Sequence, residues 1–363
     1  MKTYFDHVAK FAKESDAQGK LVEAIKDYAM TELNEKANTK FNVITEYSKA
    51  QKAQKIQEIF LSEVEKRSKY KASEMDLEVY ASLDIVNKMA VMLQKIMIDA
   101  VTPIFIDATG LAMLSEFHYG GYNDTFSFEV TDPTLFTVSK IGSREKHTNS
   151  QRKEKVNKAI NTSFYGITTI STLPEYLTGE ANVAEDTLKS AMSINRKIYS
   201  LVVKKFISAT ASITDTDLIV AGYTEDGLLE KLRAGSAKNG SKMLLVADAV
   251  PAKVILPDNT QTRVFLQDEY NTTLGYMSIW NTYNVMAFGV VEDEDGTALG
   301  LPLKKIYGIP VDGTKLIHVA IGASGSNTDD YFDNDNLSSR STLRRQIGVE
   351  LATNKKVVRV DLA

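Results

Sequence analysis

Hydrophobic side chains in the first hundred residues recur every three or four positions, a spacing that predicts helices. Leu21, Ile25 and Tyr28 lie on one such face, and an apolar run extends from 77 to 98. The opposite faces are dense in Lys and Glu, so each helix has one side for packing and one for solvent. We expect residues 1–115 to form a helical N-terminal region that lies against the rest of the chain.

The pattern then changes from helical spacing to alternation. Residues 110–123 predict a turn-rich joint, and apolar residues alternate with polar ones from Phe126 to Val130, as in a strand. The chain is almost wholly polar from Ser139 to Lys158 and strand-like again from Phe164 to Ile170. We therefore expect residues 116–180 to form a long two-stranded hairpin with a solvated tip.

The clearest predicted helix follows this hairpin. Asn182 is a good N-cap, and Glu185 stands three residues later, as in a reciprocal capping arrangement. One face stays apolar as far as Phe206. A helix from Asn182 to Ala209 is about 40 Å long at ~1.5 Å per residue, about twice the mean length. We expect a spine helix within residues 181–215 that organises the fold.

A mixed α/β pattern occupies residues 216–328. It predicts a helix from Asp226 to Ala234, ended by Gly235. Short apolar runs separated by Gly, Asn and Asp turns predict strands at 218–220, 243–246, 254–256, 285–288 and 316–320. Residues 329–363 predict two closing strands, 343–351 and 357–362, joined by a polar turn. The predicted fold class is α+β.

Composition limits the classes of function. The 363 residues are 43% hydrophobic and 25% charged, with a formal net charge of -4 and no cysteine. Proteins that grip nucleic acid usually carry a strong basic excess, so we expect any nucleic-acid partner to be enclosed without sequence-specific binding. The absence of cysteine excludes disulfides, thiolate catalysis and thiolate metal sites, and a reducing cytoplasm suits such a chain.

We expect no signal peptide and no membrane span. The start, Met1 to His7, lacks the apolar core of a signal peptide. The most apolar stretch, 89–114, is interrupted at Gln94, Lys95, Asp99, Pro103 and Asp107. A spanning helix needs ~20 nearly uninterrupted apolar residues.

The histidines predict no metal site. The sequence has four of them, His7, His118, His147 and His318, and none pair at metal-ligand spacing. His318 lies in an apolar strand, where a structural role is the simpler interpretation.

Three motifs resemble functional loops but depart from them. Residues 235–242 nearly spell a phosphate loop, but a helix precedes and a strand follows, the reverse of the required order. Residues 333–336 begin like a calcium loop, but Arg344 stands where the bidentate Glu belongs. Residues 322–326 lack the last glycine of a nucleophile elbow. We therefore expect no enzyme activity, catalytic residues or cofactor.

The polar tip of the hairpin is the most informative charge feature. Seven basic residues face two acidic ones there, a local excess of five positive charges: Lys140, Arg144, Lys146, Arg152, Lys153, Lys155 and Lys158 against Glu145 and Glu154. One interpretation is a solvated loop. The other is a contact with an acidic surface of a neighbouring copy. Candidate acidic partners are Glu292, Asp293, Glu294, Asp295, Asp329, Asp330, Asp333 and Asp335.

The order of these elements over residues 115–363 resembles the major capsid protein of tailed double-stranded DNA bacteriophages. Two segments also resemble the family locally. Gly308-Ile309-Pro310-Val311 is similar to a strand entry late in its A (axial) domain, and 343–360 is similar to its closing strands.

The resemblance implies a function for each part of the chain. It implies an N-terminal arm or scaffold-like region at 1–115, an E-loop at 116–180, a P (peripheral) domain spine helix at 181–215, an A domain at 216–328 and returning P-domain strands at 329–363. It also implies a structural head protein that forms pentamers and hexamers. These would close into an icosahedral shell around double-stranded DNA, with scaffold and portal proteins as partners. Such a protein belongs to the virion and is assembled in the host cytoplasm.

Three alternatives stay open at the sequence level. An encapsulin-like compartment shell shares the fold and holds protein cargo, and a tail-tube or other virion component would form rings or tubes. An α/β enzyme is the third, although no complete catalytic constellation is visible.

Overall fold

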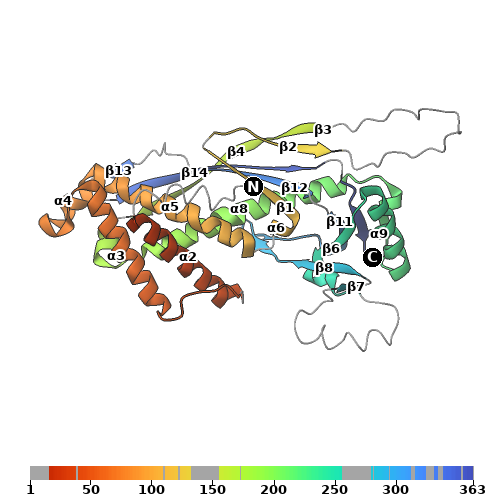
Figure 1. Cartoon of the computed structure of the whole chain (residues 1–363), viewed down its shortest axis with the longest axis horizontal. Coiled ribbons are helices and arrows are strands. Elements are labelled where there is room, and N and C mark those ends of the chain that lie inside the picture. The colour runs from red at the N-terminus through yellow and green to blue at the C-terminus, as the bar shows by residue number, and fades with distance from the viewer. Residues whose placement is uncertain are drawn as a thin grey trace, which may run out of the picture.

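The computed structural model describes residues 16–37, 40–108, 111–121, 123–131, 155–171, 173–255, 279–280, 282–293, 295–311, 315–323, 331–333, 338–352 and 355–362. The described chain is elongated, with a group of helices at one end and an α/β unit at the other (Figure 1). Its helices and sheets confirm the predicted α+β class.

The N-terminal region is helical, as its periodicity predicts. It contains α2 (Asp16–Ala37), α3 (Lys49–Ser68), α4 (Leu77–Ser82) and α5 (Asp84–Ala108). The predicted apolar faces are buried, with Leu21, Ile25 and Ile56 fully covered in a shared core. Ser48 begins α3 with a complete capping box to Gln51.

Helix α5 has the length and composition of a membrane-spanning helix over Asp84–Asp107, and 67% of that window is buried inside the protein. It packs against α2, α3 and the later helix α8 (Val183–Ala211). Such burial is typical of a core helix. Pro103 lies within α5 without ending it.

The predicted spine is α8 (Val183–Ala211), which is 29 residues long. Asn182 caps it by accepting a hydrogen bond from the Ala184 N–H, at 2.9 Å. The helix packs against α5, α3 and α2, and also against strands of both main sheets. It therefore connects the two ends of the molecule (Figure 1).

The first main sheet has five strands: β1 (Ser115–Gly120), β12 (Ile317–Gly322), β14 (Ser338–Leu351), β13 (Tyr331–Asp333) and β4 (Thr162–Ser171). Strand β14 is central, because β4 pairs with one side of it and both β12 and β13 with the other. Strand β1 extends the sheet beyond β12 in parallel. The prediction of a turn-rich joint at 110–123 is therefore wrong, because this segment contains the short helix α6 (Leu111–Leu114) and strand β1.

Strands β2 (Phe126–Thr131) and β3 (Lys155–Ile160) form a separate antiparallel ribbon. Strands are confirmed at 126–130 and 164–170, but their expected pairing is wrong. Residues 164–170 belong to β4 and pair with β14. The true partner, β3, is mostly polar and exposed, so it carries almost no hydrophobic alternation.

The second main sheet has six strands in the order β5 (Ile219–Ala221), β15 (Val358–Asp361), β11 (Lys305–Val311), β6 (Lys242–Asp248), β8 (Tyr283–Phe288) and β7 (Ile279–Trp280). Both faces are covered. Leu245 and Val358 face a core under helix α9 (Glu225–Asn239), whereas Leu244 and Tyr307 face the core shared with α8. The Tyr307 ring meets Phe206 of α8 edge-on at 4.9 Å.

The C-terminal strands do not pair with each other: β14 belongs to the first sheet and β15 to the second. Helix α9 (Glu225–Asn239) is longer than predicted and ends at Gly240, which adopts a left-handed conformation. Gly235 instead lies inside α9, where an added Cβ would be 2.8 Å from Val358. No strand forms at Val254 and Ile255, which follow the short α10 (Ala249–Ala252).

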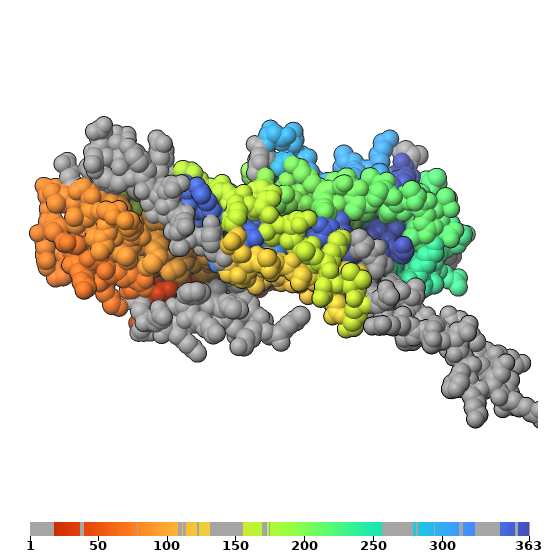
Figure 2. Space-filling view, turned by 90° about the horizontal axis from the view of Figure 1, so that it is seen from above, coloured from red at the N-terminus to blue at the C-terminus, as the bar shows by residue number. Residues whose placement is uncertain are grey.

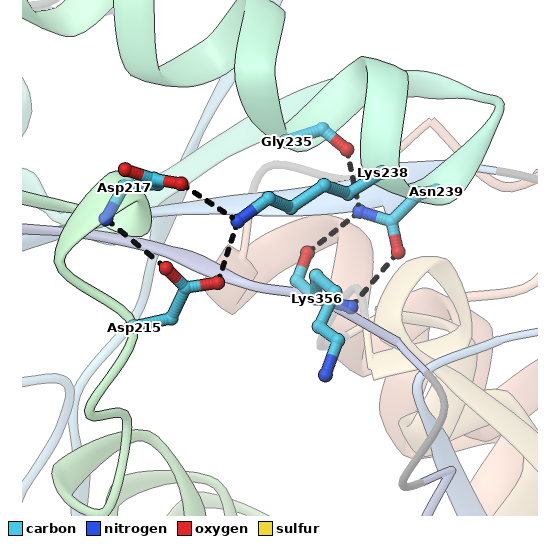
Figure 3. A network of polar contacts seen from close by, with 6 residues as sticks. All are labelled: Asp215, Asp217, Gly235, Lys238, Asn239 and Lys356. Atoms are coloured by element: carbon cyan, nitrogen blue, oxygen red, sulfur yellow. Dashed lines mark hydrogen bonds and ion pairs between the residues drawn. The ribbon is translucent and has the colours of Figure 1, made fainter.

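A polar network holds the end of α9 to its neighbours (Figure 3). Lys238 donates to Asp215 at 2.6 Å and to Asp217 at 3.2 Å. The Asn239 side chain exchanges two hydrogen bonds, both 2.8 Å, with the Lys356 backbone just before β15. Lys238 and Asn239 of the phosphate-like segment therefore have structural roles, which agrees with the predicted helix-to-strand turn.

Candidate assembly surfaces and the cluster beneath the ribbon

The β2–β3 ribbon rests on the first sheet through a small apolar contact. Phe126, Phe128 and Ile160 of the ribbon pack with Ala320 and Ala352. An isolated two-stranded ribbon is marginal in water, so this contact helps to hold the ribbon in place. In the space-filling view the ribbon lies along the side of the narrow described body (Figure 2).

Two predicted basic contact residues lie within the described ribbon. Lys155 pairs across the ribbon with Glu129 at 2.7 Å. Lys158 contacts the Glu350 carboxylate at 3.2 Å and donates to the Leu351 carbonyl at 3.1 Å. Both therefore have partners within their own chain. The other five predicted basic residues lie outside the described residues: Lys140, Arg144, Lys146, Arg152 and Lys153.

Glu350 connects three elements at the base of the ribbon. Besides Lys158 of β3, its carboxylate contacts Lys205 of α8 at 3.3 Å, while the residue itself belongs to β14. Burial acts to raise the pKa of Glu350, but the Leu351 N–H and the two lysines outweigh it and hold the pKa below its ordinary value. The carboxylate is therefore ionised at neutral pH.

The acidic turn near 292 is divided between internal and exposed groups. Asp293 is buried and accepts hydrogen bonds from Ser200 and Lys204 of α8. Glu292 is exposed and lies 3.4 Å from Arg196. Asp295 accepts from the Thr297 hydroxyl at 2.6 Å. Within the described part of the turn, Glu292 and Asp295 are the carboxylates accessible to another molecule.

The remaining predicted acidic partners are not placed. Glu294, Asp329, Asp330 and Asp335 lie outside the described residues, as does the rest of the calcium-like segment. Asp333 ends β13, and its side chain is not described. The contact between the basic tip and these carboxylates stays a prediction.

Several large apolar side chains on the described surface are exposed. Val156 of β3 and Phe164 of β4 are 59% and 49% exposed, beside the ribbon. At the α/β end, Val250, Ile279 and Leu303 are at least 57% exposed. These side chains are candidate positions for contact with another protein surface.

A cluster of titratable groups lies between the first sheet and the ribbon. Glu116 of β1 is in register with His318 of β12, and His118 is two residues further along β1, on the same face. His118 Nε2 lies 3.0 Å from His318 Nδ1, and Glu116 Oε2 lies 3.7 Å from that Nδ1. The Phe128 ring of the ribbon stacks on the His318 ring at 3.7 Å.

Both histidines of this cluster are neutral at neutral pH. Burial, with His118 nearby, lowers the pKa of His318 to about 4. Burial also lowers the pKa of His118, although Glu116 opposes it. The sequence interpretation of scattered, unpaired histidines is corrected here, because β1 and β12 bring together two residues that are 200 positions apart. No local spacing could reveal this pair.

No protein-family profile and no curated protein matches the sequence. Solved structures do resemble it. The mature capsid of bacteriophage PhiM1 is 11% identical over 69% of this chain and 86% of that chain, with a TM-score of 0.45. The head of Helicobacter pylori bacteriophage KHP40 is 11% identical over 70% of this chain and 91% of that chain, also at 0.45.

A virus-like particle from Pyrococcus furiosus is 11% identical over 73% of this chain and 98% of that chain, with a TM-score of 0.43. All three are capsid, head or particle structures.

Proposed function

We propose that this chain is the major structural subunit of a closed protein shell. Its pentamers and hexamers assemble into an icosahedral head around double-stranded DNA, as in the tailed-phage family that its order of elements resembles. Its role is mechanical rather than catalytic.

The observation that carries this proposal is the β2–β3 ribbon. It belongs to neither main sheet and is held by a five-residue apolar cluster and the contacts of Lys158. Val156 on the ribbon and Phe164 on the neighbouring β4 remain exposed. A second copy that lies against this side would cover both side chains and support the ribbon.

The parts of the chain take the following roles in this proposal. The ribbon is the E-loop that lies across a neighbouring subunit, α8 is the spine of the P domain, and the six-stranded sheet with α9 forms the body of the A domain. Contacts between copies are individually weak, and closure of the shell makes them collectively strong.

The mild net negative charge of -4 suits a wall that encloses DNA without gripping it. Isolated subunits should therefore bind duplex DNA weakly. Tight binding that falls steeply with added salt would contradict an enclosing role for this surface.

The deciding experiment is negative-stain electron microscopy of the full-length chain after size-exclusion chromatography, with and without a candidate scaffold protein. Closed polyhedral shells or capsomer rings are the expected result. Open tubes would instead indicate a tail-tube protein, and a monomer under every condition would overturn the proposal.

The contents of purified shells separate the two kinds of compartment. Nuclease-protected DNA is expected in particles isolated from an infected or induced host. A co-purifying folded protein cargo without DNA would indicate an encapsulin-like compartment instead.

A further inference from the structure

We propose that Glu116, His118 and His318 form a binding site for one Zn²⁺ ion on the ribbon-facing side of the first sheet. The three side chains come from two adjacent parallel strands, β1 and β12. Their ligand atoms all lie within 4.8 Å of one another. This site is independent of the proposed shell function.

The spacing of the donor atoms fits a tetrahedral ion. With zinc–ligand bonds of ~2.0–2.2 Å, two ligands of one ion lie about 3.3 Å apart. The two imidazole nitrogens are 3.0 Å apart, and the Glu116 oxygen is 3.7 Å from the nearer one. The carboxylate has room to close on an ion, because the Glu116 side chain is 31% exposed.

The type of donor also fits zinc. Two imidazole nitrogens and one carboxylate oxygen, with a water in the fourth position, form a set that zinc accepts readily. Magnesium and calcium prefer oxygen donors, so neither competes well for this pair of histidines. The exposed side of Glu116 leaves a path for the ion and for its water.

The surroundings hold the ligands in place. Strand pairing fixes Glu116 opposite His318. His318 is buried, its ring is stacked under Phe128, and it also hydrogen-bonds to the backbone of Lys315. A second hydrogen bond of this kind orients a ligating histidine. Because Phe128 belongs to the ribbon, an ion that fixes the His318 ring also stabilises the contact between the ribbon and the first sheet.

The competing interpretation is a simple N–H···N hydrogen bond between two neutral imidazoles at 3.0 Å. That bond explains why the two histidine rings lie close together, and it does not involve Glu116. The zinc site requires all three residues, so Glu116 distinguishes the two interpretations.

The test uses the full-length chain, stripped with a chelator and titrated with Zn²⁺ by calorimetry. Bound Co²⁺ is followed by its visible absorption spectrum, which reports the coordination geometry. We expect one Zn²⁺ per chain, a tetrahedral Co²⁺ spectrum and a higher melting temperature with zinc. Glu116→Gln should weaken zinc binding at least tenfold, and His118→Asn should abolish it.

A matched variant serves as the control. Glu129→Gln removes a described carboxylate from the ribbon, where it pairs with Lys155, and should bind zinc like the parent chain. If His118→Asn fails to fold, Glu116→Gln decides alone, because its side chain is partly exposed. Zinc binding that is absent, or unchanged in both ligand variants, would overturn the proposal.

Discussion

At the scale of single residues, close approaches between elements leave no space for ordinary side chains. Gly348 of β14 lies under the connection between β3 and β4. A Cβ at this position would be 2.5 Å from the Asn161 backbone oxygen. Backbone cannot rotate aside as a flexible side chain can, so the position requires glycine.

Gly348→Ala should therefore lower the free energy of unfolding by about 1–3 kcal/mol, the usual cost of overpacking. Gly166→Ala is the matched control, because it lies in the paired strand β4 and its Cβ would make ordinary contacts of 3.6 Å or more. Urea denaturation of both variants measures the difference. Equal stabilities would show that the backbone near Asn161 shifts without cost.

Glu32 is a second residue with a predictable effect, this time on pH dependence. It is buried on α2, between Lys36 at 2.6 Å and Lys49 of α3. Burial acts to raise the pKa of Glu32, but the two lysines outweigh it and the pKa is lowered from 4.5. Its stabilising contribution is then fully present above the unfolded value and is lost as pH falls through the folded value.

Melting temperature should therefore fall more steeply below pH 4.5 in the parent chain than in Glu32→Gln, which has no carboxylate to protonate. At pH 7 the variant should already be less stable. Parallel curves for the two proteins across this range would exclude Glu32 as a source of acid sensitivity.

At the scale of elements, the spine helix and the ribbon differ in how they are stabilised. Helix α8 has an N-cap and a continuous buried face, so its stability follows from its own sequence and its packing. Strand β3 is mostly exposed, and its polar residues depend on what lies against them. In the proposed shell, contacts between copies should therefore affect the ribbon more than any other described element.

Reversing the tip charges tests this dependence. The triple variant Arg152→Glu, Lys153→Glu and Lys155→Glu should keep the circular dichroism spectrum of the parent chain but lose assembled particles, if an acidic neighbour binds the tip. The matched control keeps the charge, with Arg152→Lys, Lys153→Arg and Lys155→Arg. Normal particles from the reversed variant would show that the tip is only solvated.

Local signals predicted the helices and most strands, whereas pairings between distant segments could not be predicted. Asn182 and the apolar face after it were sufficient to place α8. Strand β3 was missed because a half-exposed ribbon needs few apolar residues, and β1 was mistaken for a turn because of Gly120-Gly121. The histidine cluster was missed because its two halves meet only when β1 pairs with β12.

At the scale of the whole molecule, the two main sheets are not separate units in sequence. Strand β12 follows strands of the second sheet in sequence but belongs to the first sheet. Strand β15 follows β14 of the first sheet but belongs to the second. Helix α8 packs against both. These exchanges should make the two ends of the molecule unfold together.

Trp280 provides a local probe for this coupling, because it is the one tryptophan in the sequence and is fully buried in β7 of the second sheet. Far-ultraviolet circular dichroism reports mainly the helices, many of which lie at the other end (Figure 1). The two signals should give the same urea midpoint. Separate midpoints would show that the ends are independent.

The positions of β14 and β15 also have a consequence for synthesis. They are the last two strands of the described chain, yet each lies inside a sheet, β14 between β4 and β12 and β15 between β5 and β11. While the chain is still on the ribosome, neither sheet can close before its last strand emerges. A chain whose translation stops before β14 would therefore have unpaired edges on the strands that β14 and β15 normally join.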